Sequence, residues 1–382
     1  MAEMNIEALN ADCRAALEIF PSNHFDSVVT DPPYALVSIV KRFGKTSQAD
    51  DTQTSDRSRK GSDGYARLAK GFMGKEWDNG ATAFAVEFWH EVYRVLKPGG
   101  YVVAFGGSRT YHRLACAIED AGFIIHPMLG WLFGQGFPKA HKVEDAAWEG
   151  WAYGAQSTKP ALEPICFAQK PFSEKTGTAN VLRWRTGAIN IDGCRIHADD
   201  AQGGAYTVTR LKPGATLNAT GGNWRPEEGG VLYHGETKPG RWPANLCHDG
   251  SAEVLAAFPN SDGQLAAVGP ANGPKSSINV YGDYGPREQC EPRNDSGSAA
   301  RFFYCAKASK QDRAGSKHPT VKPINLIRWL ARLVTPPNGL ILDPFAGSGT
   351  TGAAAHLEGF RAVLVEREAE YFADIERRLA AL

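Results

Sequence analysis

The stretch "GLILDPFAGSGTTGAAAHLEGF", residues 339–360, has the pattern of a strand, a glycine turn and a helix in succession. Apolar residues run into Asp343, and the glycines that begin at Gly347 have the spacing GxGxxG. Glu366 lies at the end of the next predicted strand, where its carboxylate can accept hydrogen bonds from ribose hydroxyls. The combination predicts a nucleotide-binding turn of the Rossmann type.

Two features argue against a nicotinamide cofactor at this turn. Asp343 directly precedes the glycines, where its charge would repel a pyrophosphate and attract a cationic ligand. The C-terminal segment that contains the turn also has only two predicted strands, the last two of the chain. A doubly wound sheet needs several more. The missing strands must come from the N-terminal part of the chain, so we expect one sheet assembled from both chain ends.

The first 170 residues alternate strand-like and helix-like segments. Such alternation predicts an α/β fold with a parallel sheet and helices on both faces. The predicted strands are 5–9, 25–31, 101–108, 124–133, 339–343 and 361–366. The predicted helices are 13–20, 82–97 with a stop at Pro-Gly-Gly, 111–123, 324–335, the segment after the glycine turn, and 369–382.

The middle of the chain has a different composition. Residues 170–300 are dense in Gly, Pro and Asn, show weak periodicity and carry Trp, Tyr and Arg among the turn residues. We therefore divide the chain into one half of the α/β domain (1–169), a loop-rich insert (170–300) and the second half (301–382). The polar segment 43–64 predicts a surface loop, either a lid or a passive insertion.

Composition excludes several classes of protein. Lys plus Arg and Asp plus Glu each number 42, so the formal net charge is zero and does not indicate a nucleic-acid partner. Only local basic patches could bind nucleic acid. No apolar run reaches the length of a membrane span, and no secretory signal is visible. The seven cysteines include no CxxC pair, so we expect reduced thiols and no structural zinc in a cytoplasmic protein.

A second motif stands at the other end of the chain. "TDPPY", residues 30–34, ends an apolar strand in a carboxylate, two prolines and an aromatic ring. Together the motifs resemble the β group of S-adenosylmethionine-dependent DNA amino-methyltransferases, in which the catalytic motif precedes the cofactor motif. The segments that carry the resemblance are TDPPY, "HPTVKP" 318–323, "DPFAGSGTT" 343–351, "VLVE" 363–366, "NADC" 10–13, "GFMGKEWD" 71–78, "LKPGG" 96–100 and "FFYCAKASKQDR" 302–313.

The resemblance implies a fold and a division of labour. The fold would be a Rossmann-like methyltransferase sheet with circularly permuted motif order. The insert, which matches the family only loosely, would be the target-recognition module that selects the DNA sequence. The enzyme would be a bacterial or phage-encoded DNA methyltransferase that acts by base flipping.

The resemblance assigns the catalytic role to Asp31, Pro32, Pro33 and Tyr34. The exocyclic amine of adenine or cytosine is a poor nucleophile, because its lone pair is delocalised into the ring. Acceptors aimed at its protons favour the tetrahedral state: the Asp31 carboxylate is one, and the Pro32 carbonyl, held rigidly by the prolines, is another. Tyr34 offers a ring on which the flipped base can stack.

The resemblance also implies S-adenosylmethionine as the cofactor. Lys322 or the Thr320 hydroxyl would hold its carboxylate, Asp12 would accept from the adenine amine, and Glu366 would accept from the ribose. Backbone N–H groups at the start of the helix suit the carboxylate as well. The complete predicted set is Asp12, Asp31, His318, Thr320, Lys322, Asp343, Phe345, Gly347, Ser348, Gly349, Thr350 and Glu366.

Double-stranded DNA is the expected partner, bound by local basic and aromatic residues. A homodimer is a further expectation, because relatives are often dimers; a restriction partner is left open. The predicted DNA-binding residues are Lys45, Arg57, Arg59, Lys60, Trp224, Arg225, Arg241, Trp242 and Lys307.

Four functions remain open at this point. Adenine-N6 methylation leads, because an Asp at the first motif position fits adenine better within the family. Cytosine-N4 methylation is the nearest alternative. Protein glutamine methylation uses a similar Pro-Pro-Tyr clamp, although usually in the reverse motif order, and a DNA-binding module with a vestigial cofactor fold would be non-enzymatic.

Overall fold

The computed structural model describes residues 6–34, 81–198, 204–211, 230–262, 296–306, 309–316, 318 and 320–382. The chain divides into two compact units. Unit 1 comprises residues 1–193, 245–254 and 305–382, and unit 2 comprises residues 194–244 and 255–304. The predicted loop 43–64 lies outside the described residues.

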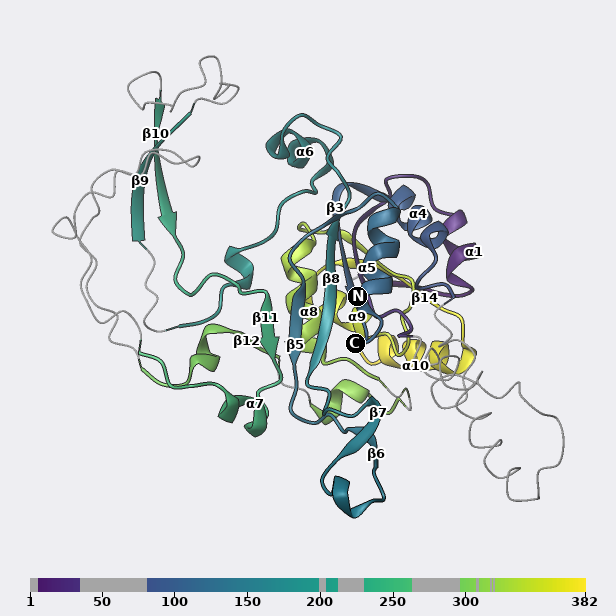
Figure 1. The fold of residues 1–382 in the computed structure, drawn as a ribbon. Coiled ribbons are helices and arrows are strands. Elements are labelled where there is room, and N and C mark those ends of the chain that lie inside the picture. Colours follow the sequence, from purple (N-terminus) through teal and green to yellow (C-terminus); the bar gives the residue numbers. More distant parts are fainter. Residues whose placement is uncertain are drawn as a thin grey trace. The chain divides into compact units, whose positions relative to one another are not determined.

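Within the described residues, ten strands form one sheet, which Figure 1 shows at the centre of unit 1. Neighbours along the main path are β1 (Ile6–Asn10), β14 (Arg361–Glu366), β13 (Leu340–Asp343), β2 (Phe25–Thr30), β3 (Leu96–Phe105), β8 (Leu162–Gln169), β5 (Leu129–Leu132), β11 (Leu246–His248) and β12 (Tyr304–Cys305). The short β4 (Ile124–Ile125) pairs with β8 off this path.

The predicted parallel arrangement is confirmed for the five strands from β1 to β3. It does not extend to β8, a strand that was not predicted, which runs antiparallel to both β3 and β5. The segment between β5 and β8 contains the antiparallel hairpin of β6 (Lys139–Lys142) and β7 (Ala152–Gln156) rather than a helix. Parallel neighbours need a long, usually helical crossover, whereas a hairpin connection returns the chain in the opposite direction.

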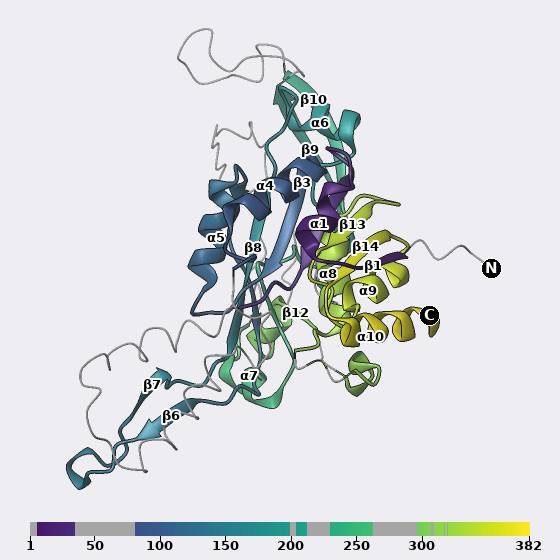
Figure 2. The ribbon, with the colours of Figure 1, turned by 90° about the vertical axis from the view of Figure 1, so that its right-hand side faces the viewer.

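Helices cover both faces of the sheet, as predicted. On one face α1 (Cys13–Glu18), α4 (Val86–Val95) and α5 (Tyr111–Asp120) pack in a row. On the other, α8 (Ile324–Val334) and α10 (Ala369–Ala380) flank α9 (Thr350–Glu358). Figure 2 shows the two groups on opposite sides of the strands.

The two ends of the chain meet at the centre of the sheet. β2 and β13 are parallel neighbours, with Ile341 opposite Ser27 and Leu342 opposite Val28. Every residue of both strands is buried, which is typical of central strands in a sheet covered on both faces. The expectation that one sheet is assembled from both chain ends is therefore confirmed.

Two predicted element boundaries are wrong for reasons of backbone pairing. α4 ends at Val95 and β3 begins at Leu96, so the Pro-Gly-Gly segment belongs to a strand, where Gly99 and Gly100 exchange backbone hydrogen bonds with Lys170 at 2.9 Å. The predicted strand 124–133 is two strands, β4 and β5, because Pro127 between them has no N–H to continue the ladder.

The structure draws the boundaries of the insert differently from the predicted 170–300. Helix α6 (Gly177–Trp184) belongs to unit 1, because its buried Asn180 donates to the backbone oxygens of Pro98 and Thr186, each at 2.9 Å. Residues 245–254 also belong to unit 1, where β11 pairs in parallel with β5. The insert therefore consists of two separate segments that make up unit 2.

Unit 2 has little regular structure in its described residues. Its main element is the antiparallel pair of β9 (Gly204–Leu211) and β10 (Gly230–Thr237). An isolated antiparallel bridge joins Ile196 to Arg241. The remaining short elements in the described residues of both units are α7 (Ala252–Ala257) and the 3-10 helices Ala146–Trp148, Asp192–Cys194, Ala299–Phe302 and Lys310–Arg313. No helix in the described part of the chain is both long and apolar enough to cross a bilayer.

Candidate active site

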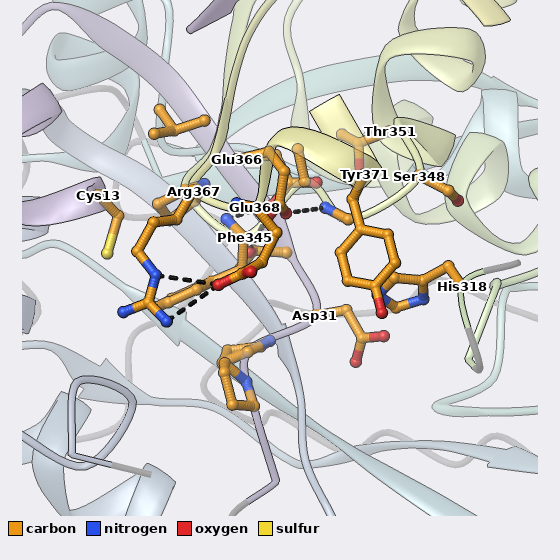
Figure 3. A pocket seen from close by; sticks show the side chains of 18 of the residues that line it. Cys13, Asp31, His318, Phe345, Ser348, Thr351, Glu366, Arg367, Glu368 and Tyr371 are labelled. Atoms are coloured by element: carbon orange, nitrogen blue, oxygen red, sulfur yellow. Dashed lines mark hydrogen bonds and ion pairs between the residues drawn. The ribbon is translucent and has the colours of Figure 1, made fainter. Parts of the chain in front are cut away.

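A cleft opens at the carboxyl ends of β13 and β2. From β13 the chain continues through α9 to β14 on one side, and from β2 it continues to β3 on the other side. Such a switch point between neighbouring parallel strands is where open α/β sheets bind their ligands. The cleft contains about 1300 Å³ of space, its open mouth included, and is lined by both chain ends. Figure 3 shows Asp31, His318 and Tyr371 toward one end of this view and Cys13 and Arg367 toward the other.

The glycine turn has the backbone geometry that its sequence predicts. Gly347 and Gly349 have φ values of +53° and +77°, in the left-handed region that side chains other than glycine rarely adopt. A Cβ on Gly352 would lie 2.6 Å from the Leu364 side chain, so this glycine allows α9 to pack closely on β14. The three glycines thus form the turn and bring the helix start to the cleft.

Arg378 of α10 anchors the glycine turn through hydrogen bonds to backbone carbonyls. Its Nε donates to the Ser348 carbonyl at 2.8 Å, and its Nη2 donates to the Asp312 carbonyl at 2.8 Å. Arg378 is buried although it is one of the two adjacent arginines in a terminal helix. Its spacing from Tyr371 and Ile375 places Arg378 on the buried face of α10, a signal that the prediction of the site residues did not use.

Glu366, at the end of β14, closes the turn from the other side. Its Oε2 accepts from the Gly347 backbone N–H and its Oε1 accepts from that of Glu368, both at 2.8 Å. Burial raises the pKa of Glu366 to about 7. Each carboxylate oxygen keeps a second lone pair, so Glu366 remains able to accept from ligand hydroxyls.

Asp343 is buried beneath the turn, where it is part of the lining of the cleft. Its Oδ1 accepts from the Thr30 hydroxyl at 2.6 Å and from the Phe345 backbone N–H at 3.1 Å. Burial raises the pKa of Asp343 to about 6. Asp343 therefore joins the ends of β13 and β2, and Thr30 is a second residue that the sequence analysis missed.

The TDPPY segment places two polar groups against each other. The Tyr34 hydroxyl donates to Oδ1 of Asp31 at 2.8 Å, and the Thr110 hydroxyl donates to the Tyr34 carbonyl at 2.8 Å. Burial, and next the charge of Asp31, raise the pKa of Tyr34 well above its usual value. Tyr34 is therefore a neutral hydrogen-bond donor to Asp31 at ordinary pH, besides offering its ring.

Lys322 lines the cleft and contacts the TDPPY segment. Its ammonium donates to Oδ2 of Asp31 at 2.7 Å and to the Tyr34 hydroxyl at 3.1 Å, and it forms an ion pair with Glu163 at 3.4 Å. The two hydrogen bonds and the ion pair commit the ammonium mainly to partners within the protein. Of the two predicted ligands for the cofactor carboxylate, Thr320 is the one whose side chain is exposed, at the rim of the cleft.

Glu163 is the third residue that the sequence analysis missed. It lies near the start of β8, in "LEPICFAQ", and its carboxylate faces the TDPPY segment. A signal was available, because an acid beside an apolar strand run is the same pattern that singled out Asp31. What the sequence could not provide is the position of β8 beyond β3.

The other predicted cofactor residues line the cleft in supporting positions. Asp12 caps α1, with its side chain accepting from the Arg14 backbone N–H at 2.9 Å. The His318 ring meets the Tyr371 ring edge-on at 4.5 Å between centroids, and burial lowers the pKa of His318. Phe345 packs against Phe88, and Gly347, Ser348 and Thr350 form the turn at the floor of the cleft. Gly349 lies behind them, against Ile375.

Only two of the predicted DNA-binding residues lie in the described part of the chain. In unit 2 the Arg241 guanidinium lies 4.5 Å from the Phe302 ring centroid, and the Arg195 guanidinium lies 5.6 Å from that of the exposed Trp242. The others, Lys45, Arg57, Arg59, Lys60, Trp224, Arg225 and Lys307, lie outside the described residues. Among the described side chains, no cluster of His, Cys, Asp and Glu has the composition of a metal site.

Comparison with known protein families gives a match over most of the chain. The family model described as DNA methylase, for the N6 and N4 enzymes, matches residues 25–377. Type II methyltransferase M.HindIII of Haemophilus influenzae is 28% identical over 208 residues, which cover 47% of this chain and 63% of that protein. Type II methyltransferase M2.LlaDCHI of Lactococcus lactis subsp. cremoris is 39% identical over 70 residues, 18% of this chain and 26% of that protein.

The matched part spans less than two thirds of either relative. Among solved structures, the PvuII DNA methyltransferase (cytosine-N4-specific) aligns with 98% of this chain and 88% of its own. That alignment has 17% identity and a TM-score of 0.43.

Arg378→Met should loosen the glycine turn. The variant loses both charge-assisted hydrogen bonds to backbone carbonyls, each of which contributes about 1.5–3 kcal/mol. Hydrogen–deuterium exchange of a peptide covering residues 345–352 should then be about tenfold faster. The matched control is Arg377→Met, which removes only an exposed ion pair with Asp374 and should leave this peptide unchanged. Equal exchange in the two variants would contradict the anchoring role of Arg378.

Proposed function

Because the chain belongs to the DNA methylase family, we propose that it transfers a methyl group from S-adenosylmethionine to adenine N6 in double-stranded DNA. The observation that carries this proposal is the convergence, in one cleft, of the glycine turn from one chain end and the Asp31 carboxylate from the other. The matched family supports the reaction class, and Asp31 as the first residue of the Asp-Pro-Pro-Tyr motif favours adenine.

The residues of the cleft suit the chemistry of the cofactor. When bound, S-adenosylmethionine supplies a methyl group activated by a sulfonium cation. We assign the ribose hydroxyls to Glu366 and the adenine amine to Asp12, which lie at the ends of two adjacent strands, β14 and β1. The turn at Gly347 and Ser348, with Thr320 at the rim, is assigned to the amino-acid part. Buried carboxylates around the cleft suit a cationic ligand.

Asp31 and Pro32 act on the nucleobase in this proposal. The free lone pairs of the Asp31 carboxylate accept one N–H of the exocyclic amine, and the Pro32 carbonyl accepts the other. Two acceptors at the two protons direct the nitrogen lone pair out of the ring plane, toward the electrophile. Because the Tyr34 hydroxyl is bound to Asp31, its ring is held beside the same carboxylate and is assigned to stack on the flipped base.

The proposed reaction predicts one modified nucleoside. Purified protein, a tritium-labelled methyl donor and DNA from a methylation-free host should give acid-stable label in the DNA. Digestion to nucleosides followed by mass spectrometry should identify N6-methyladenine. N4-methylcytosine would establish the alternative substrate, since the clamp fits either amine, and label in protein but not in DNA would refute DNA methylation altogether.

Asp31→Asn should abolish most of the methyl transfer. The amide keeps the size of the side chain but replaces one acceptor oxygen by a donor, which repels the amine protons. Removing a single group of this electrostatic kind costs about 10²–10³-fold in rate. Single-turnover rates should fall by that factor, whereas cofactor affinity measured by calorimetry should change little. A variant with normal turnover would remove Asp31 from the mechanism.

Cofactor affinity should rise with pH through about 7, the pKa of Glu366. The raised pKa means that Glu366 is largely protonated at pH 6.5 and ionised at pH 8.5, and the ionised form accepts hydroxyl hydrogen bonds better. The neutral fragment methylthioadenosine, which has no titrating amine in this range, should bind about fourfold more tightly at pH 8.5 by linkage. Glu366→Gln should bind weakly with no pH dependence in this window; an unchanged pH dependence in this variant would assign the effect to another group.

A further inference from the structure

The strongest feature that the proposed mechanism does not use is a buried cluster of charges behind Asp31. Two carboxylates, Asp31 and Glu163, face the single ammonium of Lys322 at 2.7 Å and 3.4 Å. The side chain of Lys322 is only 6% exposed, whereas those of Asp31 and Glu163 are 23% and 20% exposed. An ion pair this deep is costly to desolvate, and it needs good geometry on every side to be tolerated.

Three separate parts of the fold supply this cluster. Asp31 follows β2, Glu163 lies in β8, and Lys322 directly precedes the proline before α8. β3 separates β2 from β8, and its last residue, Phe105, packs its ring centroid 5.0 Å from the Lys322 ammonium. The ammonium is thus confined by an aromatic ring on one side and by acceptors on the others.

The electrostatics of the cluster depend on both carboxylates. Burial alone would lower the pKa of Lys322, but Asp31 and Glu163 outweigh burial and raise it, so the ammonium stays charged. Burial raises the pKa of Glu163, and the Lys322 charge opposes that rise. The other titratable groups that face the pair are Tyr34 and, beside Asp31 and Lys322, His318.

Both oxygens of Asp31 are oriented by this arrangement. Lys322 donates to Oδ2 and Tyr34 donates to Oδ1, while Lys322 also donates to the Tyr34 hydroxyl. The three groups form a closed ring of hydrogen bonds, so the carboxylate has one preferred rotation. One lone pair on each oxygen is used and one remains, which leaves Asp31 able to accept from a substrate amine.

We propose that Glu163 and Lys322 are positioning residues for Asp31, an inference that rests on the proposed methyl transfer. Lys322 fixes the orientation of the Asp31 carboxylate. Glu163 keeps the ammonium in place when the substrate amine competes for Asp31, because the second carboxylate holds Lys322 from the side away from the substrate. Neither residue contacts the reacting atoms.

The alternative is an ion pair that only stabilises the fold. Such a role predicts that Glu163→Gln lowers stability or ligand affinity, and that any loss of rate follows from the loss of folded protein. A positioning role predicts a loss in the chemical step alone, because misorienting a reacting group lowers the rate without weakening the binding of its partners.

Glu163→Gln is the decisive variant, since it removes the charge and keeps the shape. Single-turnover methyl transfer at saturating cofactor and DNA should be about 10- to 100-fold slower. The dissociation constants of cofactor and DNA should stay within about twofold, and so should the fraction of folded protein. The matched control is Glu174→Gln, which removes a carboxylate of an ion pair at the surface of the same unit. This control should have the wild-type rate.

A double-mutant cycle tests whether Glu163 acts through Lys322. In a Lys322→Met background, Glu163→Gln should change the rate by less than about twofold, because the group that it positions is gone. If Lys322→Met does not fold, Lys322→Arg serves as the background instead. Arginine keeps the positive charge that Glu163 holds, so Glu163→Gln should slow the reaction in that background. Full additivity of the Glu163 and Lys322→Met effects would overturn the proposal.

A crystal structure of the ligand-free Glu163→Gln variant gives a readout that does not depend on activity. The Lys322 ammonium should move and the Asp31 carboxylate should adopt a second orientation. If the wild-type protein methylates DNA, an unmoved Asp31 in the variant together with a wild-type rate of the variant would refute the positioning role. Absence of methylation by the wild-type protein in the same assay would instead refute the proposed function.

Discussion

The parallel pairing of β13 with β2 is the constraint on which the rest of the structure depends. It joins strands that are more than 300 residues apart in the chain, and the 2.6 Å hydrogen bond from Thr30 to Asp343 fastens their carboxyl ends. Because both faces of these strands are packed, a one-residue register shift would turn each side chain to the opposite face, where it does not fit its neighbours. The pairing therefore fixes the distance between the glycine turn and the TDPPY segment, and the cleft exists only because of it.

Buried carboxylates give the cleft its chemical character. Asp343, Glu366 and Asp31 each follow or end a strand at the same edge of the sheet, and each is held by donors from the protein. Backbone N–H groups hold Glu366, a hydroxyl and a backbone N–H hold Asp343, and an ammonium with a tyrosine holds Asp31. These differences in partners explain how neighbouring acids can serve separate purposes: Asp343 joins two strands, Glu366 shapes the turn, and Asp31 keeps free lone pairs toward the cleft.

The antiparallel strand β8 changes what the sheet can place beside the cleft. A parallel strand in this position would begin at the far edge, whereas β8 begins at the active-site edge, because it follows the hairpin of β6 and β7. Its second residue, Glu163, therefore reaches Lys322 and the back of Asp31. The reversal of one strand thus adds a second layer of charge behind the carboxylate that we assign to the substrate amine.

The sequence by itself determined the five parallel strands β1, β2, β3, β13 and β14, the glycine turn and the motif order, because each depends on local pattern: apolar runs, left-handed glycines and an acid at a strand end. It also determined that both chain ends must share one sheet, since neither end has enough strands alone. Only the tertiary structure decided the direction of β8, the partners of Arg378 and the partners of Lys322. Those depend on contacts between segments far apart in the chain, and no local pattern distinguishes a lysine that faces a ligand from one that faces two buried carboxylates.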